Sequence, residues 1–204
     1  MNVRFALIVM EFQGLRDYVA LLEHNLPVIV HRESQFKAGL ADLGVDEGAI
    51  DGLYELQSGA ATRLIAGSAI VALWAAYEAA VNFSAGYLQQ QREVALPLRS
   101  LRGSFLDRAR MYFDDVLKFD LHPVEDANWD RLRVLAEVRH SFAHDNGKDP
   151  GPKTARGKML RAWASTTTEL RVAEGYVVPS LAFVRESAEY LSSLVAELIM
   201  RVRG

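Results

Sequence analysis

The sequence predicts an all-α fold, a bundle of about five main helices with one small β-hairpin before the last helix. Three observations predict it. Apolar residues recur at the three- and four-residue spacing of a helix near both ends of the chain. A long alanine-rich apolar segment lies between them, and the residue pattern of strands is confined to a short stretch around residues 166–178.

The first helix is expected over about the first forty residues. One face of it is apolar and is made by Phe5, Ile8, Val9, Phe12 and Leu15. Pro27 has no N–H group and should kink or split this helix. Residues 44–47 form the next turn, where Asp46 is the expected N-cap of a second helix over about residues 47–92.

Three more helices are expected. Pro97 begins the third, over about residues 98–119, which ends at His122 and Pro123. The fourth runs from about residue 125 to Asn146 and Gly147, a pair typical of helix C-termini. Two short strands, residues 166–172 and 176–178, precede the last helix at about residues 180–203. The core stripe of this last helix contains Leu181, Val184, Ala188, Leu191, Leu194, Val195 and Leu198.

Length and composition allow one large domain or two small ones. Because no repeat or low-complexity tract divides the chain, we expect a single domain over residues 1–204. Residues 1–44 would be an N-terminal helical extension, and residues 45–204 the bundle itself.

The absence of cysteine excludes disulfides, thiolate zinc sites and thiol nucleophiles, and it suits a reducing, cytoplasmic location. The apolar run at residues 5–10 is too short for a signal peptide. Residues 64–83 are long enough to cross a bilayer. Their many alanines, with Gly67, Ser68, Glu78 and Asn82, favour the buried helix of a soluble protein instead. We therefore expect no membrane association.

Charge is unevenly distributed along the chain. The formal net charge of −3 argues against a uniformly basic nucleic-acid binder. Residues 147–161, which contain several glycines and prolines and are expected to form a loop, nevertheless carry a net charge of +4. The candidate RNA-binding residues in this loop are Lys148, Lys153, Arg156 and Lys158. The alternative is a solvated, flexible connection.

The fourth expected helix carries the most informative residues. Leu135, Val138 and Phe142 should face the core, whereas His140 and His144, four residues apart, lie together on the opposite side. Arg139 lies on the flank of the apolar stripe. A purely structural interpretation remains open, because histidines stabilise helix C-termini and Arg139 could pair with Glu137 or another acid.

The helix that ends at Asn-Gly contains an arginine and a histidine separated by four residues. A polar residue directly follows the arginine. This pattern resembles the HEPN superfamily (higher eukaryotes and prokaryotes nucleotide-binding domains), whose signature is Arg-x4–6-His. Arg139, His140 and His144 match the signature positions. The order of elements is also similar over residues 45–204: an alanine-rich helix with Trp-Ala-Ala-Tyr-Glu at residues 74–78, a third helix, the motif helix and a final amphipathic helix.

The resemblance implies a metal-independent endoribonuclease that needs no cofactor. His144 would act as base or acid, Arg139 would stabilise the phosphorane, and His140 would orient the phosphate or share proton transfer. The resemblance also implies a homodimer through the motif helix, with a composite site for RNA. A toxin or phage-defence role follows from the family, with a possible antitoxin such as a minimal nucleotidyltransferase.

Two further residues are assigned supporting roles. Glu78 is a lone carboxylate in an apolar segment, and burying it unpaired would be costly. It either faces the motif helix and holds Arg139 or a histidine, or it lies on a solvated stripe of its own helix. Asn146 is the second supporting residue, at the end of the motif helix.

Two alternatives to the ribonuclease stay open. A catalytically inactive HEPN module would bind nucleotides or proteins. A metal site would use His140 and His144, whose spacing suits metal ligation, with Asp145 adjacent. Glu137 and His140 match half of a di-iron signature, but no second Glu-x-x-His occurs in the chain, so we expect no metal.

Overall fold

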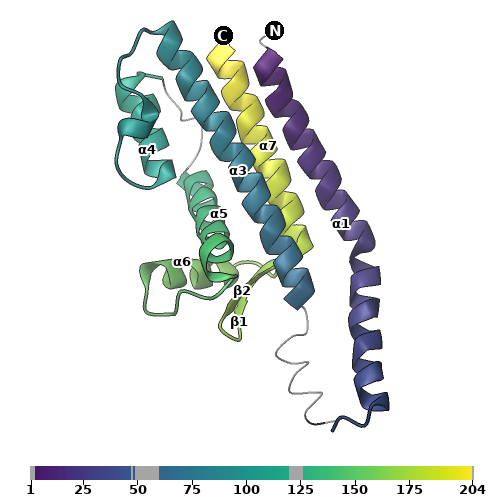
Figure 1. The fold of residues 1–204 in the computed structure, drawn as a ribbon. Helices are drawn as coiled ribbons and strands as arrows, with labels where there is room; N and C mark the ends of the chain where they lie inside the picture. Colours follow the sequence, from purple (N-terminus) through teal and green to yellow (C-terminus); the bar gives the residue numbers. More distant parts are fainter. Residues whose placement is uncertain (1–2, 47, 49–59, 120–125, 204) are drawn as a thin grey trace.

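The computed structural model describes residues 3–46, 48, 60–119 and 126–203 (Figure 1). Six α-helices and one two-stranded antiparallel sheet make up this part of the chain, which confirms the predicted all-α class and the hairpin before the last helix. The elements are α1 (Val3–Asp42), α3 (Ala60–Gln91), α4 (Phe105–Met111), α5 (Asp126–Asp145), α6 (Ala155–Ala164), β1 (Leu170–Ala173), β2 (Tyr176–Pro179) and α7 (Leu181–Arg203).

Three long helices, α1, α3 and α7, lie side by side and form the main layer of the bundle (Figure 1). Helix α5 packs on α3, and α6 and the hairpin lie near its C-terminal end. Almost all of the predicted core stripe of α7 is buried, and Leu194 is half-buried. Ser180 caps α7, because its hydroxyl oxygen accepts a 3.0 Å hydrogen bond from the Phe183 N–H.

Helix α1 packs through a narrow stripe. Phe5 and Phe12 are buried as predicted, and the ring of Phe5 meets those of Phe83 and Tyr87 at centroid distances of 5.0 and 5.3 Å. Val9 is half exposed, so its predicted place on the same face as Phe5 and Phe12 is wrong. It lies about 100° around the helix from Ile8, beyond the reach of α3 and α7.

Pro27 does not split α1, which continues through it as one helix. Figure 1 shows α1 changing direction about halfway along its length. A bend of this kind agrees with the predicted kink, since proline removes one backbone hydrogen bond and clashes with the preceding turn.

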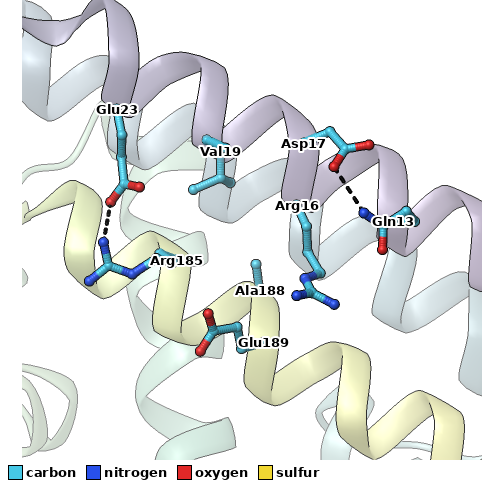
Figure 2. Close-up of a pocket in the computed structure, with 9 residues that line it drawn as sticks. Gln13, Arg16, Asp17, Val19, Glu23, Arg185, Ala188 and Glu189 are labelled. Carbon is cyan, nitrogen blue, oxygen red and sulfur yellow. Dashed lines mark hydrogen bonds and ion pairs between the residues drawn. The ribbon is translucent and has the colours of Figure 1, made fainter.

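Polar side chains line the outer edge of the contact between α1 and α7 (Figure 2). Arg185 of α7 pairs with Glu23 of α1 at 2.7 Å, and the Gln13 amide donates to Asp17 at 2.9 Å. The ion pair joins two helices that are far apart in the chain, at the edge of their apolar contact.

The prediction of one continuous third helix over about residues 98–119 is wrong. Residues Leu98–Ser100 form a short 3-10 turn, and the chain then breaks at Gly103, whose φ of 116° is left-handed. Ser104 caps α4, since its hydroxyl accepts a hydrogen bond from the Asp107 N–H. After α4 the chain widens into a π-helical turn over Tyr112–Val116, which the Tyr112 hydroxyl anchors to the Leu96 carbonyl at 2.7 Å. The start expected for the second helix and the stop at His122 and Pro123 lie outside the described residues.

Helix α3 has the length and apolar composition of a membrane span. Just over half of its most apolar window, 56%, is buried inside the protein, as in the core helix of a soluble bundle. Soluble, cytoplasmic behaviour without membrane association stays a prediction.

Candidate active site

The motif residues lie near the C-terminal end of α5, as the sequence predicts. Leu135 and Val138 are buried against the bundle, which turns Arg139 and His140 to a partly exposed surface. His144 is exposed in the last turn. The sequence therefore placed the core side and the polar side of this helix correctly.

Phe142 fixes the rotation of α5 on α3. Its ring fills the space that a Cβ atom at Gly67 would occupy, at 2.0 Å from the Phe142 Cδ1 atom. A Cβ atom at Gly147 would also meet the ring, at 2.7 Å. The two glycines therefore allow the backbones of α3 and of the turn after α5 to approach the motif helix closely.

His140 and His144 contact each other through their rings, with centroids 4.6 Å apart and planes inclined by 52°. Partial burial lowers the pKa of His140 below its usual 6.5, and the charges of Arg156 and His144 lower it further. Glu137 and Asp145 oppose this shift only in part. At neutral pH the His140 ring is therefore uncharged and able to accept a proton.

A pocket of about 420 Å³ opens beside Arg139 and His140. It is bounded by α3, α4, α5 and α6, and its wall is partly aromatic and partly charged. Its lining residues are Trp74, Glu78, Ser104, Phe105, Leu106, Asp107, Arg133, Ala136, Glu137, Arg139, His140 and Met159. His144 and the three lysines of the basic segment do not line it.

Glu78 lines this pocket together with Arg139 and His140. Its carboxylate accepts a 2.7 Å hydrogen bond from the Trp74 indole N–H, four residues earlier in α3. Glu78 matches neither of its two predicted positions completely. Its side chain is half-buried and faces the same pocket as the motif residues, but its hydrogen-bond partner is Trp74 and not Arg139.

Arg139 makes no hydrogen bond or ion pair with any residue that the structure describes. Glu137, the acid nearest to it in the sequence, is engaged by Arg156 of α6 instead. The Arg139 guanidinium is therefore available to a bound anion, and guanidinium groups bind phosphate oxygens in a bidentate manner.

The basic segment differs from the predicted loop. Residues 147–154 do form a loop, but α6 begins at Ala155 and includes Arg156 and Lys158. Thr154 caps this helix by accepting a 2.9 Å hydrogen bond from the Gly157 N–H. Position 157 lies in this helix and has to be glycine, because a Cβ atom there would lie 1.9 Å from the Gly151 carbonyl oxygen.

Part of the charge of this segment is neutralised. Arg156 pairs with Glu137, and Arg161 pairs with Asp149. Lys148, Lys153 and Lys158 are exposed. The cationic surface beside α5 is thus smaller than the sequence suggested, with three lysines as its exposed charges.

The loop after α5 is held by the hairpin. The turn between β1 and β2, at Glu174 and Gly175, has two positive φ angles, as two-residue hairpins require. The Val177 N–H donates to the Gly147 carbonyl, and the Asp149 N–H donates to the Gly175 carbonyl, both at 2.8 Å. These bonds argue against the flexible connection considered above.

Asn146 and Gly147 end the motif helix, with φ angles of 53° and 78°. Arg63 of α3 donates a 2.8 Å hydrogen bond to the Asn146 carbonyl and lies 4.2 Å from the centre of the Tyr176 ring. Sequence reasoning missed Arg63, because nothing local shows that the start of α3 reaches the end of α5. The structure supports Asn146 as a turn residue, and its side chain is exposed.

The part of the chain that the structure describes brings few potential metal ligands together. No group of three His, Asp or Glu side chains there is close enough together to hold a metal ion. His140 and His144 form a pair only, as far as the described residues extend.

Comparison of the chain with known proteins finds no matching family model, no similar curated protein and no similar solved structure.

Proposed function

We propose that this protein is a HEPN-type, metal-independent endoribonuclease. One observation carries the proposal: Arg139, without a partner among the described residues, lines the same pocket as His140, whose ring contacts His144. The combination supplies a fixed cation and a pair of imidazoles within two turns of one helix.

The chemistry follows from these three side chains. One imidazole removes the proton from a ribose 2′-hydroxyl, which attacks the adjacent phosphorus, and the other protonates the departing 5′-oxygen. The neutral state of His140 suits it to accept the first proton, and His144 then acts as the acid. Arg139 stabilises the charge that develops on the phosphorane oxygens. The products are a 2′,3′-cyclic phosphate and a 5′-hydroxyl, and no metal or other cofactor takes part.

The neighbouring residues have supporting roles in this proposal. The pocket beside Arg139 has room for a nucleotide, and Trp74 and Phe105 offer apolar contacts for its base. Glu78 keeps Trp74 in position through their hydrogen bond. The exposed lysines at positions 148, 153 and 158 attract the RNA backbone.

We further propose that two copies meet through the exposed end of α5, which gives a composite site with Arg139 and His144 from both chains. A toxin or phage-defence role is the biological setting that this activity favours. A cognate antitoxin, for example a minimal nucleotidyltransferase, would then be the partner that restrains it.

The test is cleavage of total RNA in EDTA by the wild-type protein and by Arg139→Ala and His144→Ala. We expect cleavage by the wild type, a loss of at least a hundredfold in each variant, and 2′,3′-cyclic phosphate ends. His24→Ala and Arg99→Ala are matched controls on exposed sites and should cleave normally. Cleavage that survives both motif substitutions contradicts the mechanism, and cleavage abolished by EDTA points to a metal site.

The pocket also favours the second candidate, an inactive module that binds a nucleotide. Its volume suits one nucleotide, and it contains Arg139 as a partner for phosphate. Calorimetry with single nucleotides separates the two functions: binding that Arg139→Ala abolishes, without cleavage by antitoxin-free wild type, supports the module.

A further inference from the structure

Helix α1 has two apolar stripes on opposite sides. The inner stripe faces α3 and α7 and follows alternating three- and four-residue steps. Its members are Phe5, Ile8, Phe12, Leu15, Val19, Leu22 and Leu26, all buried or partly buried. This spacing is typical of one helix packed in a bundle.

The outer stripe lies on the solvent side and follows three- and four-residue steps from Val3 to Leu21, with Val28 seven residues further on. Its members are Val3, Leu7, Met10, Gly14, Tyr18, Leu21 and Val28. At 100° per residue they lie about 140° around the helix from the inner stripe. The six side chains besides Gly14 are between 42% and 71% exposed.

Apolar residues at three- and four-residue steps on an exposed face indicate a helix partner, because scattered surface apolar residues have no such order. The middle of the stripe, from Leu7 to Leu21, is also symmetric about its centre. Gly14 lies midway between Leu7 and Leu21, and also midway between Met10 and Tyr18. No atom lies within 4 Å of a Cβ built at Gly14, so another backbone could approach it closely.

We propose that α1 of a second copy of this chain packs antiparallel on the outer stripe, with the two-fold axis at Gly14. In this arrangement Leu7 of each chain meets Leu21 of the other, and Met10 meets Tyr18. The two Gly14 residues face each other, which lets the helices approach closely at the axis. A two-fold interface needs such a self-complementary surface.

Exposed apolar surface and charge both favour a second copy. The four side chains that pair in this arrangement, Leu7, Met10, Tyr18 and Leu21, are between 42% and 67% exposed, so each loses water-exposed apolar surface in the dimer. Residues 3–28 hold two arginines and three carboxylates, a net charge of −1. A helix that binds anionic membranes carries basic flanks instead.

This interface is independent of the proposed function. Figure 1 shows α1 and α5 on opposite sides of the layer formed by α3 and α7. Contact between outer stripes therefore leaves the end of α5 open, and it holds whether or not the protein cleaves RNA.

Disulfide trapping tests the geometry, because the chain has no cysteine of its own. Leu7→Cys and Leu21→Cys proteins are purified separately, mixed and oxidised. The mixture should form a covalent dimer on a non-reducing gel, and neither protein alone should do so. Gly14→Cys should cross-link by itself. Met200→Cys, on an exposed part of α7, is the control and should stay uncross-linked.

Sedimentation equilibrium tests the association itself. Leu7→Glu combined with Leu21→Glu should halve the mass measured for the wild type, with unchanged far-UV circular dichroism. Met200→Glu should leave the mass unchanged. A wild-type monomer, an unchanged mass in the double variant, or cross-linking of Leu7→Cys alone at the level of the mixture would each overturn the proposal.

Discussion

Replacing Gly67 with alanine should destabilise the protein, although the same change elsewhere in α3 should stabilise it. Alanine is the better helix former by about 1 kcal/mol. At position 67, however, the added methyl group would lie 2.0 and 2.2 Å from two ring atoms of Phe142. Overpacking of this kind costs about 1–3 kcal/mol. Because these contacts are very short, we expect a cost in the upper part of this range, about 2–3 kcal/mol, and hence a net loss of roughly 1–2 kcal/mol for Gly67→Ala.

Gly86 is the matched control in the same helix. No atom lies within 4 Å of a Cβ built there, so Gly86→Ala should gain about 1 kcal/mol from helix propensity alone. In a protein of this size 1 kcal/mol corresponds to about 2–4 °C, so the melting temperatures of the two variants should differ by about 4–12 °C.

Urea denaturation followed by circular dichroism measures both free energies of unfolding. Phe142→Leu in the Gly67→Ala background should recover part of the loss, since the smaller side chain makes room for the methyl group. If Gly67→Ala instead raises the stability as much as Gly86→Ala does, Phe142 is not seated against α3 and the packing of the motif helix described above is incorrect.

Three more predictions concern charge and capping. The pKa of His140 is lower in the folded protein than in the unfolded protein. The uncharged His140 ring therefore contributes fully to the free energy of unfolding above about pH 6.5, and this contribution is lost as the pH falls through the pKa of the folded state. His140→Gln should therefore flatten the decline of the urea midpoint between about pH 7 and pH 5. Arg156→Gln removes a nearby positive charge and should raise the pKa of His140, as followed by NMR titration of its ring protons. Ser180→Ala removes the cap of α7 and should cost about 1 kcal/mol in chemical denaturation. The same change should raise the pKa of Glu169, whose carboxylate the Ser180 hydroxyl stabilises, as NMR of the carboxyl carbon would show.

Local signals predicted most of the secondary structure correctly. The end of α5 was predictable because Asn146 and Gly147 readily take the positive φ that stops a helix. The hairpin was predictable from Glu174 and Gly175 for a similar reason. Helix α6 was not, because Gly157 looks like a loop residue until its contact with the Gly151 carbonyl is known.

The pairings that shape the candidate site depend on tertiary contacts. The sequence placed His140 and His144 on one side of the helix and Arg139 on the flank of the apolar stripe, since helix geometry alone decides that. It could not show that Glu137 pairs with Arg156 rather than with Arg139, because a helix break and a loop intervene. Arg63 lies 83 positions before Asn146, so no spacing rule connects them.

The close packing of α1 against α7 has a consequence for synthesis of the protein. All other described elements lie between these two helices in the chain. While a ribosome is still making the middle of the chain, the buried stripe of α1, which includes Phe5, Phe12 and Val19, lacks the part of its cover that α7 provides. Nascent chains with uncovered apolar helices aggregate easily. Chains interrupted before residue 181 should therefore depend on chaperones, or be removed by proteases, more than the completed protein.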